Sequence, residues 1–432
     1  MKHPVKVFKF GGASLRDADS VKNVASILQR YKTDKLLIVV SAMGKTTDAL
    51  EKVVEAHAGK TGKAYELLEG VKKAHYDICD QLFDKNDEVY AAVNDTFVEI
   101  EWILDDEPHD NYDYMYDQIV SVGELVSSKI VQAYLNKVAL PTQWLDARDV
   151  ILTDDIFREG WVQWPETEAR CERVVLPMLE KGGFILTQGF IGSTQENFTT
   201  TLGREGSDYT AAIFSYLLDA DSMTIWKDVP GVLTADPRLF DNVTKLDRLS
   251  YKEAIEMTYY GAKVIHPKTI KPLQNKSIPL YVKSFKDPDA EGTFISGEVE
   301  DHYPPMVAVE QNQALLQIST RDFSFVAEHH ISYLFNFIAE MRIQVNMMQN
   351  TAISFVMCVN DIDDKIDRFI EKVDDKFKVI LDRDLELVTV RHYRNDLLAS
   401  LQEDKIVMLE ERLGNTVQLV LKKVPMMKRK LN

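Results

Sequence analysis

The sequence predicts an α/β protein with a mainly parallel central sheet, followed by a smaller α+β region. Three observations lead to this prediction. The run KLLIVVSAM (35–43) is continuously apolar, which is typical of a strand buried on both faces. Similar runs alternate with stretches of helical spacing, and this alternation implies parallel strands covered by helices on both faces. After about residue 297 the order becomes strand–helix–strand–strand–helix–strand, which is ferredoxin-like.

The N-terminal elements follow one another in this alternating order. VKVFKF (5–10) is predicted to be the first strand, and apolar residues of 20–31 share one helical face. Residues 48–140 are predicted to be mainly helical, interrupted by an acidic, aromatic-rich loop at 105–117. The later elements are a buried run at 183–192, a glycine-bearing loop at 203–208, a helix over 208–218 and the strand MTIWKDV (223–229).

The C-terminal elements follow the ferredoxin-like order twice. The first copy is complete, and the second is shortened, with DLLASLQ (396–402) as a brief helix. A linker with several prolines, at about 286–306, separates this region from the N-terminal part. We therefore expect one domain over 1–297 and a second region over 306–432.

Composition narrows the classes of protein to consider. The chain has 432 residues, enough for two or three domains, and a net charge of -17, which disfavours binding to nucleic acid or anionic membranes. No apolar stretch reaches the roughly 20 residues of a membrane span, and the N-terminus lacks a signal-peptide pattern. The three cysteines have no metal-like spacing. We expect a cytoplasmic protein that binds anions with a few placed cations and backbone amides.

The segment Lys9-Phe10-Gly11-Gly12-Ala13-Ser14 ends the first strand. Paired glycines permit a tight turn whose amides point at a ligand, and Lys9 adds a positive charge, so phosphate oxygens are a natural ligand. The alternative is a tight turn beside a solvated lysine.

A second glycine-bearing loop, Gly203-Arg204-Glu205-Gly206-Ser207-Asp208, lies between a buried strand and a helix. Ser207 and Asp208 are suitable helix-capping residues, which is one interpretation. In the other, Arg204 clamps a carboxylate and Asp208 organises a lysine or a metal-bound phosphate.

Three further segments carry polar residues with two interpretations each. The GKTT at 44–47 is not a P-loop, because Val39 occupies the position of the required first glycine. Glu124 could pair with an amino group or lie on a solvated helix face. His266 before a proline favours a structural role, and Asp236-Pro237-Arg238 favours a turn.

Together, these motifs resemble the amino acid kinase family, and within it the aspartokinases, over essentially the whole chain. The resemblance implies the α/β/α sandwich of that family, followed by tandem ACT regulatory domains of ferredoxin-like fold. The matching segments are KFGGAS (9–14), VVSAMGKTTDAL (39–50), GELVSS (123–128), GFIG (189–192), TTLGREGSDYTAA (200–212), IWKDVPGVLTADPR (225–238), YYGAKVIHP (259–267) and SFKDPDAEGTFI (284–295).

The resemblance also implies a role for individual residues. Lys9, Gly11 and Gly12 would hold the phosphates of ATP, with Lys9 and Asp208 in the catalytic role. The substrate L-aspartate would be held by Thr47, Glu124, Arg204 and Ser207, with Glu124 facing its ammonium group. Further nucleotide-binding positions would be Lys227, Asp228, Arg238 and Lys263. The implied reaction is ATP-dependent phosphorylation of the β-carboxylate, with Mg²⁺ carried by ATP and no protein metal site.

At some positions the residue differs from the one that is common in the family. Ala13 and Lys227 stand where threonine is common, Glu205 replaces a glycine, and Leu233 replaces a frequent aromatic residue. At this length we expect no attached homoserine dehydrogenase. ACT pairs associate between subunits, so the resemblance implies a homodimer or higher homo-oligomer.

The region expected to be regulatory, 306–432, differs most from the family. Aligned with lysine-inhibited members, it has His329-His330 in place of Gly-Phe, Asn346 in place of an aspartate, and Thr351-Ala352 in place of Ser-Glu. Both carboxylates that would pair with the ammonium groups of lysine are replaced. We therefore expect weak inhibition by lysine.

The sequence leaves alternative functions open. The near alternative is another kinase of the superfamily, acting on glutamate or acetylglutamate. The alternative from another class is an ACT-based amino acid sensor with a decayed kinase domain, against which the retained charges at Lys9, Asp208 and Glu124 argue. A nicotinamide dehydrogenase is disfavoured because no G-x-G-x-x-G follows the first strand.

Overall fold

A computed structural model describes residues 5–261, 265–299, 302–322 and 324–423. The chain forms two compact units that are not simple consecutive halves. Unit 1 comprises Met1–Val232, Lys245–Ile255 and Val264–Asp301, and unit 2 comprises Leu233–Thr244, Glu256–Lys263 and His302–Asn432.

Unit 1 is built on an eight-stranded sheet in the order β3-β4-β2-β1-β7-β9-β10-β8. Every neighbouring pair is parallel except β9 and β10, which confirms the mainly parallel sheet. The strands are β1 (Val5–Phe10), β2 (Lys35–Val40), β3 (Thr142–Leu145), β4 (Phe184–Gln188), β7 (Ser222–Lys227), β8 (Arg248–Ser250), β9 (Leu280–Ser284) and β10 (Thr293–Ser296).

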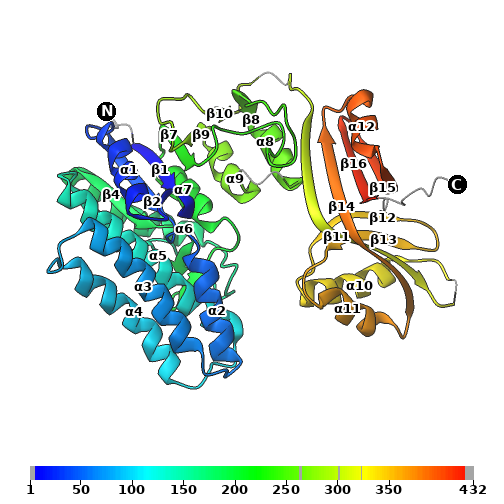
Figure 1. The fold of residues 1–432 in the computed structure, drawn as a ribbon, viewed down its shortest axis with the longest axis horizontal. Coiled ribbons are helices and arrows are strands. Elements are labelled where there is room, and N and C mark those ends of the chain that lie inside the picture. Colours follow the sequence, from blue (N-terminus) through cyan, green and yellow to red (C-terminus); the bar gives the residue numbers. More distant parts are fainter. Residues whose placement is uncertain (1–4, 262–264, 300–301, 323, 424–432) are drawn as a thin grey trace, which may run out of the picture. The chain divides into compact units, whose positions relative to one another are not determined.

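Helices cover both faces of this sheet, which confirms the α/β/α sandwich (Figure 1). One face, which carries Phe8 and Phe10, shares a hydrophobic core with α1 (Ala18–Gln29), α2 (Thr46–Ala58), α3 (Ala64–Leu82), α4 (Val89–Asp105) and α5 (Tyr112–Lys137). The remaining elements are η1 (Gly12–Ser14), η2 (Ala147–Asp149), α6 (Trp164–Lys181), β5 (Ile191–Ser193), β6 (Thr199–Thr201), α7 (Gly206–Leu217) and α9 (Pro267–Asn275). Helix α8 (Tyr251–Tyr259) begins in unit 1, and from Glu256 onward it belongs to unit 2.

The loop expected at 105–117 is shorter in the structure. Helix α4 continues to Asp105 and α5 already begins at Tyr112, so only 106–111 connect them. The side chain of Asn111 caps α5 by accepting hydrogen bonds from the backbone amides of Asp113 and Tyr114. The acidic and aromatic composition is therefore a poor guide, because this helix start is stabilised by its cap and by tertiary packing.

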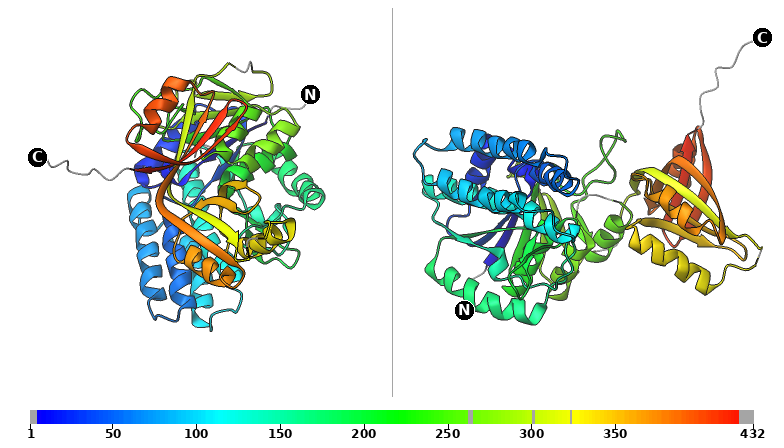
Figure 2. Two further views of the ribbon diagram at one scale, coloured as in Figure 1. Left: turned by 90° about the vertical axis from the view of Figure 1, so that its right-hand side faces the viewer. Right: turned by 90° about the horizontal axis from the view of Figure 1, so that it is seen from below.

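Unit 2 is built on a six-stranded antiparallel sheet in the order β12-β13-β11-β14-β16-β15. The order β12-β13-β11-β14 is that of a ferredoxin-like fold, and α10 and α11 pack on one face of it (Figure 2). The elements are β11 (Met306–Thr320), α10 (Glu328–Glu340), β12 (Val345–Asn350), β13 (Phe355–Asn360), α11 (Lys365–Val373), β14 (Phe377–Arg391), α12 (Asn395–Gln402), β15 (Lys405–Leu413) and β16 (Thr416–Lys423).

The second ferredoxin-like copy uses the other ends of β11 and β14 together with β15, β16 and α12. Its helix α12 has eight residues. Its core also takes in Phe240, which packs against the apolar face that includes Val390 and Leu419. Segment 233–244 thereby belongs to this core, and the backbone amide of Val307 donates to the carbonyl of Thr234 at 2.8 Å.

A second segment from before residue 297 also belongs to unit 2. The guanidinium of Arg391, buried at the end of β14, lies 2.9 Å from a carboxylate oxygen of Glu256. The position of the linker predicts that unit 2 contains only C-terminal residues. The structure adds two earlier segments to it, because Phe240 packs in its core and Glu256 pairs with Arg391.

Candidate active site

The centre of the candidate site lies at the carboxyl ends of adjacent strands in unit 1. Lys9 of β1 pairs in register with Ile225 of β7, and successive side chains of a strand alternate between the faces. Lys227, two residues after Ile225, therefore projects to the same face of the sheet as Lys9. This is the face opposite to the one that carries Phe8 and Phe10.

Asp208 meets both lysines from the first turn of α7. Its Oδ1 lies 2.6 Å from the Nζ of Lys9, and its Oδ2 lies 3.7 Å from the Nζ of Lys227. Burial alone would raise the pKa of the Asp208 carboxyl, but the charges of the two lysines outweigh it and hold the pKa below the ordinary value. The carboxylate is therefore ionised at neutral pH and organises two cations.

The glycine turn lies directly beside this ion pair. A side-chain carbon at Gly11 would lie 3.2 Å from the Nζ of Lys9, and one at Gly12 would lie 2.8 Å from the carbonyl oxygen of Gly44. The Gly44 amide in turn donates to the carbonyl of Gly12 at 3.1 Å. The turn thus needs glycine for close backbone approach, and the alternative of a solvated lysine is wrong because Lys9 is buried.

Glu124 lies in the middle of α5 and is buried, so the alternative of a solvated helix-face glutamate is wrong. Burial raises the pKa of Glu124 to about 8, although the backbone amide of Ala42 and the charge of Lys9 oppose this rise. The hydroxyl of Ser127 donates to the carbonyl of Ser41 at 2.7 Å and ties α5 to the loop after β2. The site therefore contains a buried carboxyl poised to ionise when a cation arrives.

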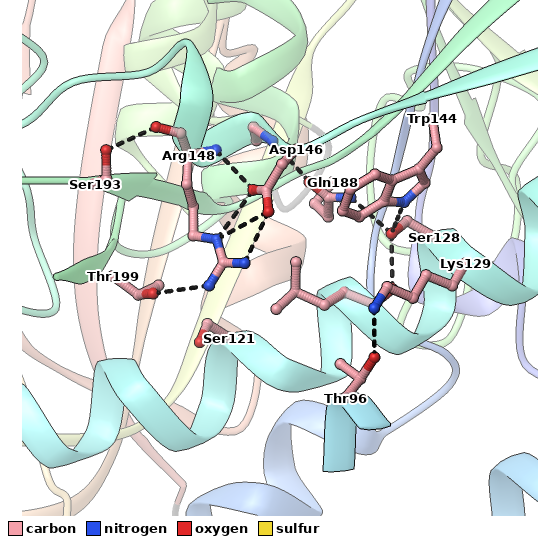
Figure 3. A network of polar contacts seen from close by, with 12 residues as sticks. Thr96, Ser121, Ser128, Lys129, Trp144, Asp146, Arg148, Gln188, Ser193 and Thr199 are labelled. Carbon is pink, nitrogen blue, oxygen red and sulfur yellow. Dashed lines mark hydrogen bonds and ion pairs between the residues drawn. The ribbon is translucent and has the colours of Figure 1, made fainter. Parts of the chain in front are cut away.

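A network of polar contacts fixes α5 against the sheet (Figure 3). The hydroxyl of Ser128 accepts hydrogen bonds from the indole of Trp144 on β3 (3.0 Å) and from the amide of Gln188 on β4 (2.8 Å). Beside it, Arg148 pairs with Asp146 through two guanidinium nitrogens. Because Ser128 lies one helical turn after Glu124, these contacts also restrict the position of Glu124.

The GREGSD segment (203–208) runs into the first turn of α7 and contributes three expected site residues. Arg204 is exposed, and its guanidinium forms no ion pair or hydrogen bond within the described part of the chain. Ser207 is buried, with its Cβ only 2.4 Å from where a side-chain carbon of Gly189 would lie. The cap of α7 is Glu205, with φ at 56°, so the capping interpretation of Ser207 and Asp208 is wrong. The carboxylate of Asp208 instead forms ion pairs with Lys9 and Lys227.

The remaining expected residues differ in their surroundings. Thr47 is half-buried in the first turn of α2, and Asp228 is exposed after β7. Arg238 lies in unit 2, in a turn where its backbone amide and guanidinium donate to the Asp236 carboxylate. Lys263 lies outside the described residues. The ring Nδ1 of His266 accepts from the backbone amide of Lys268, so His266 caps α9 and has a structural role.

One buried carboxylate is not singled out by the sequence patterns. Asp117 of α5 accepts hydrogen bonds from the backbone amides of Arg158 and Thr201, both at 2.9 Å, and from the Thr201 hydroxyl at 2.7 Å. Burial raises the pKa of the Asp117 carboxyl to about 6, against the effect of these donors. It connects α5 to the strand that leads into the GREGSD loop. The seven-residue spacing to Glu124 is the available signal, since it places both carboxyls on one helix face.

Within the described residues there is no group of three or more histidine, cysteine, aspartate or glutamate side chains suited to a metal ion. No helix there is long and apolar enough to cross a membrane. The arrangement is therefore a cation-rich turn with one ionised aspartate and one buried glutamate, which suits a phosphorylated ligand and a substrate with an amino group.

Known proteins show the same fold and sequence pattern. The model of the amino acid kinase family matches residues 4–284. The lysine-sensitive aspartokinase 3 of Escherichia coli is 32% identical over 365 residues, which cover 82% of this chain and 78% of that protein. The bifunctional aspartokinase/homoserine dehydrogenase 1 of Arabidopsis thaliana is 34% identical over 301 residues, 68% of this chain and 33% of that longer protein.

Among solved structures, E. coli aspartokinase III in complex with aspartate and ADP superposes with a TM-score of 0.84. The identity is 27%, and the match covers 97% of this chain and 96% of that one. The chain belongs to the amino acid kinase family and, within it, to the aspartokinases.

Proposed function

We propose that this protein transfers the γ-phosphoryl group of ATP to the β-carboxylate of L-aspartate, giving 4-phospho-L-aspartate, the first step of the aspartate-derived amino acid pathway. The observation that carries the proposal is the buried Lys9–Asp208 pair beside the Gly11-Gly12 turn, with the buried Glu124 of α5 near Lys9. A related aspartokinase with this fold binds aspartate and ADP, the expected pair of ligands.

The chemistry needs little proton transfer. An aspartate carboxylate is already ionised at neutral pH and can attack phosphorus directly, so no general base is required. Lys9 neutralises charge on the phosphate oxygens, and the backbone of Gly11 and Gly12 leaves room for them. Magnesium, bound to the ATP phosphates, would supply further charge neutralisation.

Substrate recognition is assigned to two charged side chains and two hydroxyl groups. Glu124 pairs with the ammonium group of aspartate, and Arg204 binds a carboxylate through its planar guanidinium. Thr47 and Ser207, in the first turns of α2 and α7, supply hydroxyl groups to the same substrate. The nucleotide is assigned to Lys227, Asp228, Arg238 and Lys263, on the resemblance to the family.

We also infer the domain roles, the location and the assembly of the protein. We assign catalysis to 1–297 and regulation to the tandem ACT region of 306–432. The protein would act in the cytoplasm as a homodimer or higher homo-oligomer, joined through the ACT region.

The test is an ATP-dependent aspartyl hydroxamate assay on the purified full chain, with glutamate as the competing substrate. We expect turnover with aspartate and little with glutamate. Lys9→Ala should lower kcat by about a hundredfold or more, because it removes charge at the phosphoryl group. Lys6→Ala is the matched control, since Lys6 lies on the same strand but pairs with Asp34 at 2.7 Å. Equal turnover in wild type and Lys9→Ala would refute the assignment.

Arg204→Lys tests the substrate subsite separately. It keeps the charge and loses the planar pair of donors, so the KM for aspartate should rise much more than the KM for ATP. A selective rise in the KM for ATP would mean that Arg204 belongs to the nucleotide subsite.

A further inference from the structure

Two consecutive residues of α5, Asp117 and Gln118, hold one edge of strand β6. The carboxylate of Asp117 accepts hydrogen bonds from the backbone amide and the hydroxyl of Thr201, at 2.9 Å and 2.7 Å. The side chain of Gln118 donates to the carbonyl of Thr199 at 2.8 Å and accepts from its backbone amide at 3.2 Å. Strand β6 pairs with β5 along its other edge. The two side chains of α5 therefore take the place of a neighbouring strand and fix β6 to the helix.

Asp117 also holds a second backbone segment. Its Oδ2 accepts a hydrogen bond at 2.9 Å from the backbone amide of Arg158. The backbone amide of Gly160 donates to the carbonyl of Thr201 at 2.8 Å, which joins this segment to β6. The carbonyl oxygen of Arg158 lies 3.4 Å from the place that a side-chain carbon of Gly203 would take. The carboxylate thus connects α5 to two segments that meet at the start of the GREGSD segment.

This connection lies between the two charged residues that are assigned to the substrate. Glu124 follows Asp117 by seven residues, about two turns, on the same helix α5. Arg204 follows Thr201 by three residues, after a turn at Gly203, where φ is 77°. The position of the Arg204 backbone relative to Glu124 is therefore fixed through Asp117. An amino acid presents its ammonium and carboxylate groups at a set separation, so this relative position matters for binding.

Burial makes these contacts strong and costly to lose. Asp117 and Thr201 are both fully buried. Hydrogen bonds are stronger away from water, and removal of the carboxylate would leave two buried backbone amides without this acceptor. Two carboxylate oxygens have enough lone pairs for all three donors, which are two amides and a hydroxyl. These contacts hold backbone in place, which is the work of a residue that positions other groups.

We propose that Asp117 is a positioning residue of the active site, which sets the place of Arg204 relative to Glu124 by holding Thr201 and Arg158. The proposal deepens the proposed function and depends on it for the identity of the substrate. Asp117 acts through Arg204 and does not itself contact aspartate.

The experiment is steady-state kinetics of the full chain in the hydroxamate assay, with aspartate and ATP varied separately. Asp117→Ala should lower kcat/KM for aspartate about tenfold to a hundredfold, and the KM for ATP should stay within about threefold of wild type. Asp117→Asn should stay within about threefold of wild type for both substrates. Its amide oxygen can accept from both backbone amides, and the Thr201 hydroxyl can turn to accept from its amide nitrogen.

Glu51→Gln is the matched control. It also replaces a carboxylate by an amide beside Arg158, but Glu51 meets the guanidinium, at 3.5 Å, and not the backbone. This variant should have the kinetics of wild type. Thr201→Val removes the hydroxyl hydrogen bond alone and keeps the shape, so kcat/KM for aspartate should fall about threefold to tenfold. It tests the proposal even if thermal unfolding shows that Asp117→Ala is not folded.

A double-mutant cycle with Arg204→Ala tests whether Asp117 acts through Arg204. If it does, the two changes are not additive. Asp117→Ala should then lower kcat/KM for aspartate by less than about threefold in the Arg204→Ala background. Full additivity of the two changes would overturn the proposal.

Two further outcomes would also overturn it: wild-type kcat/KM for aspartate in both Asp117→Ala and Thr201→Val, or an equal rise of the KM values for aspartate and ATP. Wild type reports separately on the proposed function, because wild type that does not phosphorylate aspartate would refute that function. Titration calorimetry with aspartate would then still test the positioning role, since Asp117→Ala should bind aspartate at least about tenfold more weakly than wild type. Equal affinities would refute the role.

Discussion

Gly123 of α5 lies so close to Thr46, the first residue of α2, that a side-chain carbon at position 123 would be 2.8 Å from its Cγ2. The same carbon would lie 3.2 Å from Cδ1 of Leu50. This contact brings Glu124 next to the loop that contains Ala42, and it sets the distance between two elements that carry expected substrate-binding residues, Thr47 and Glu124.

Gly123→Ala should therefore damage the site although alanine favours helices. The methyl group would push α5 away from α2, so we expect lower stability and a higher KM for aspartate. Gly70→Ala is the control: Gly70 lies in α3, and nothing lies within 4 Å of its added carbon. That variant should gain up to about 1 kcal/mol in the free energy of unfolding. Chemical denaturation and steady-state kinetics measure both, and equal behaviour of the two variants would contradict the prediction.

Binding of aspartate should release a proton from Glu124. Burial raises the pKa of this carboxyl to about 8, so it is largely protonated in the free protein at pH 7. An ammonium group bound beside it favours the ionised form and lowers the pKa. Calorimetry of aspartate binding at pH 7, in buffers of different ionisation enthalpy, should show release approaching one proton. Glu124→Gln should bind more weakly, and the buffer dependence should disappear; an unchanged buffer dependence would exclude Glu124 as the source.

The same carboxyl predicts a pH dependence of stability. The pKa in the folded state, about 8, lies above the ordinary value of 4.5, so the folded state holds the proton more tightly than the unfolded state. Its contribution to stability is therefore present at low pH and is lost as the pH rises from about 5 to about 8. Relative to Glu124→Gln, wild type without ligands should lose melting temperature across this range. A constant difference between the two proteins would contradict the raised pKa.

Glu205→Gly should stabilise the protein. Glu205 has φ at 56°, in the left-handed region where glycine is favoured over residues with a side chain. We expect a gain of about 0.5–1 kcal/mol in the free energy of unfolding, after allowance for the greater flexibility of glycine in the unfolded chain. Glu205→Ala, which keeps the strain, is the control and should gain nothing. Equal stability of the glycine and alanine variants, measured by urea denaturation, would argue against backbone strain at this position.

Lysine at millimolar concentration should inhibit the enzyme weakly. The amide nitrogen of Asn346 is already engaged, donating to Gln313 Oε1 at 2.8 Å and Asn360 Oδ1 at 2.6 Å. The Thr351 hydroxyl is likewise engaged with Ser354 at 2.8 Å. Neither side chain offers a carboxylate, and an ammonium group without an ionic partner binds poorly. Hydroxamate assays across a lysine series, with threonine and methionine in parallel, measure this; strong inhibition by sub-millimolar lysine would overturn the expectation.

Much of the site is predictable from the sequence because the key residues lie in short segments at strand and helix ends. The strand before Gly11-Gly12 and the helix after Gly206 are recognisable from their residue patterns, and these patterns single out Lys9 and Asp208. The ion pair with Lys227 cannot be derived from local patterns, because it depends on the register of β1 against β7, strands more than 200 residues apart in the chain. Periodicity defines the faces of a strand but not its neighbours.

The burial of Glu124 and Asp117 is a second feature that sequence patterns do not predict. Glu124 lies in a helix that is buried over most of its length, so amphipathic periodicity gives no sign of its burial. The acidic and aromatic surroundings of Asp117 indicate a loop, although the residue lies in α5. In both cases tertiary contacts decide the environment: the Ser128 network positions α5, and Thr201 and Arg158 surround Asp117.

The packing of Phe240 and Glu256 into unit 2 limits how this region can be exchanged between relatives. A recombination event, or a designed chimera, that replaced only the residues after 306 would bring a foreign sheet against the native segments 233–244 and 256–261. The newcomer would need an apolar surface that accepts Phe240 and a cation that meets Glu256, as Arg391 does here. The C-terminal region is therefore compatible only with matching sequences at 233–244 and 256–261, and these three parts of the sequence are expected to change together in evolution.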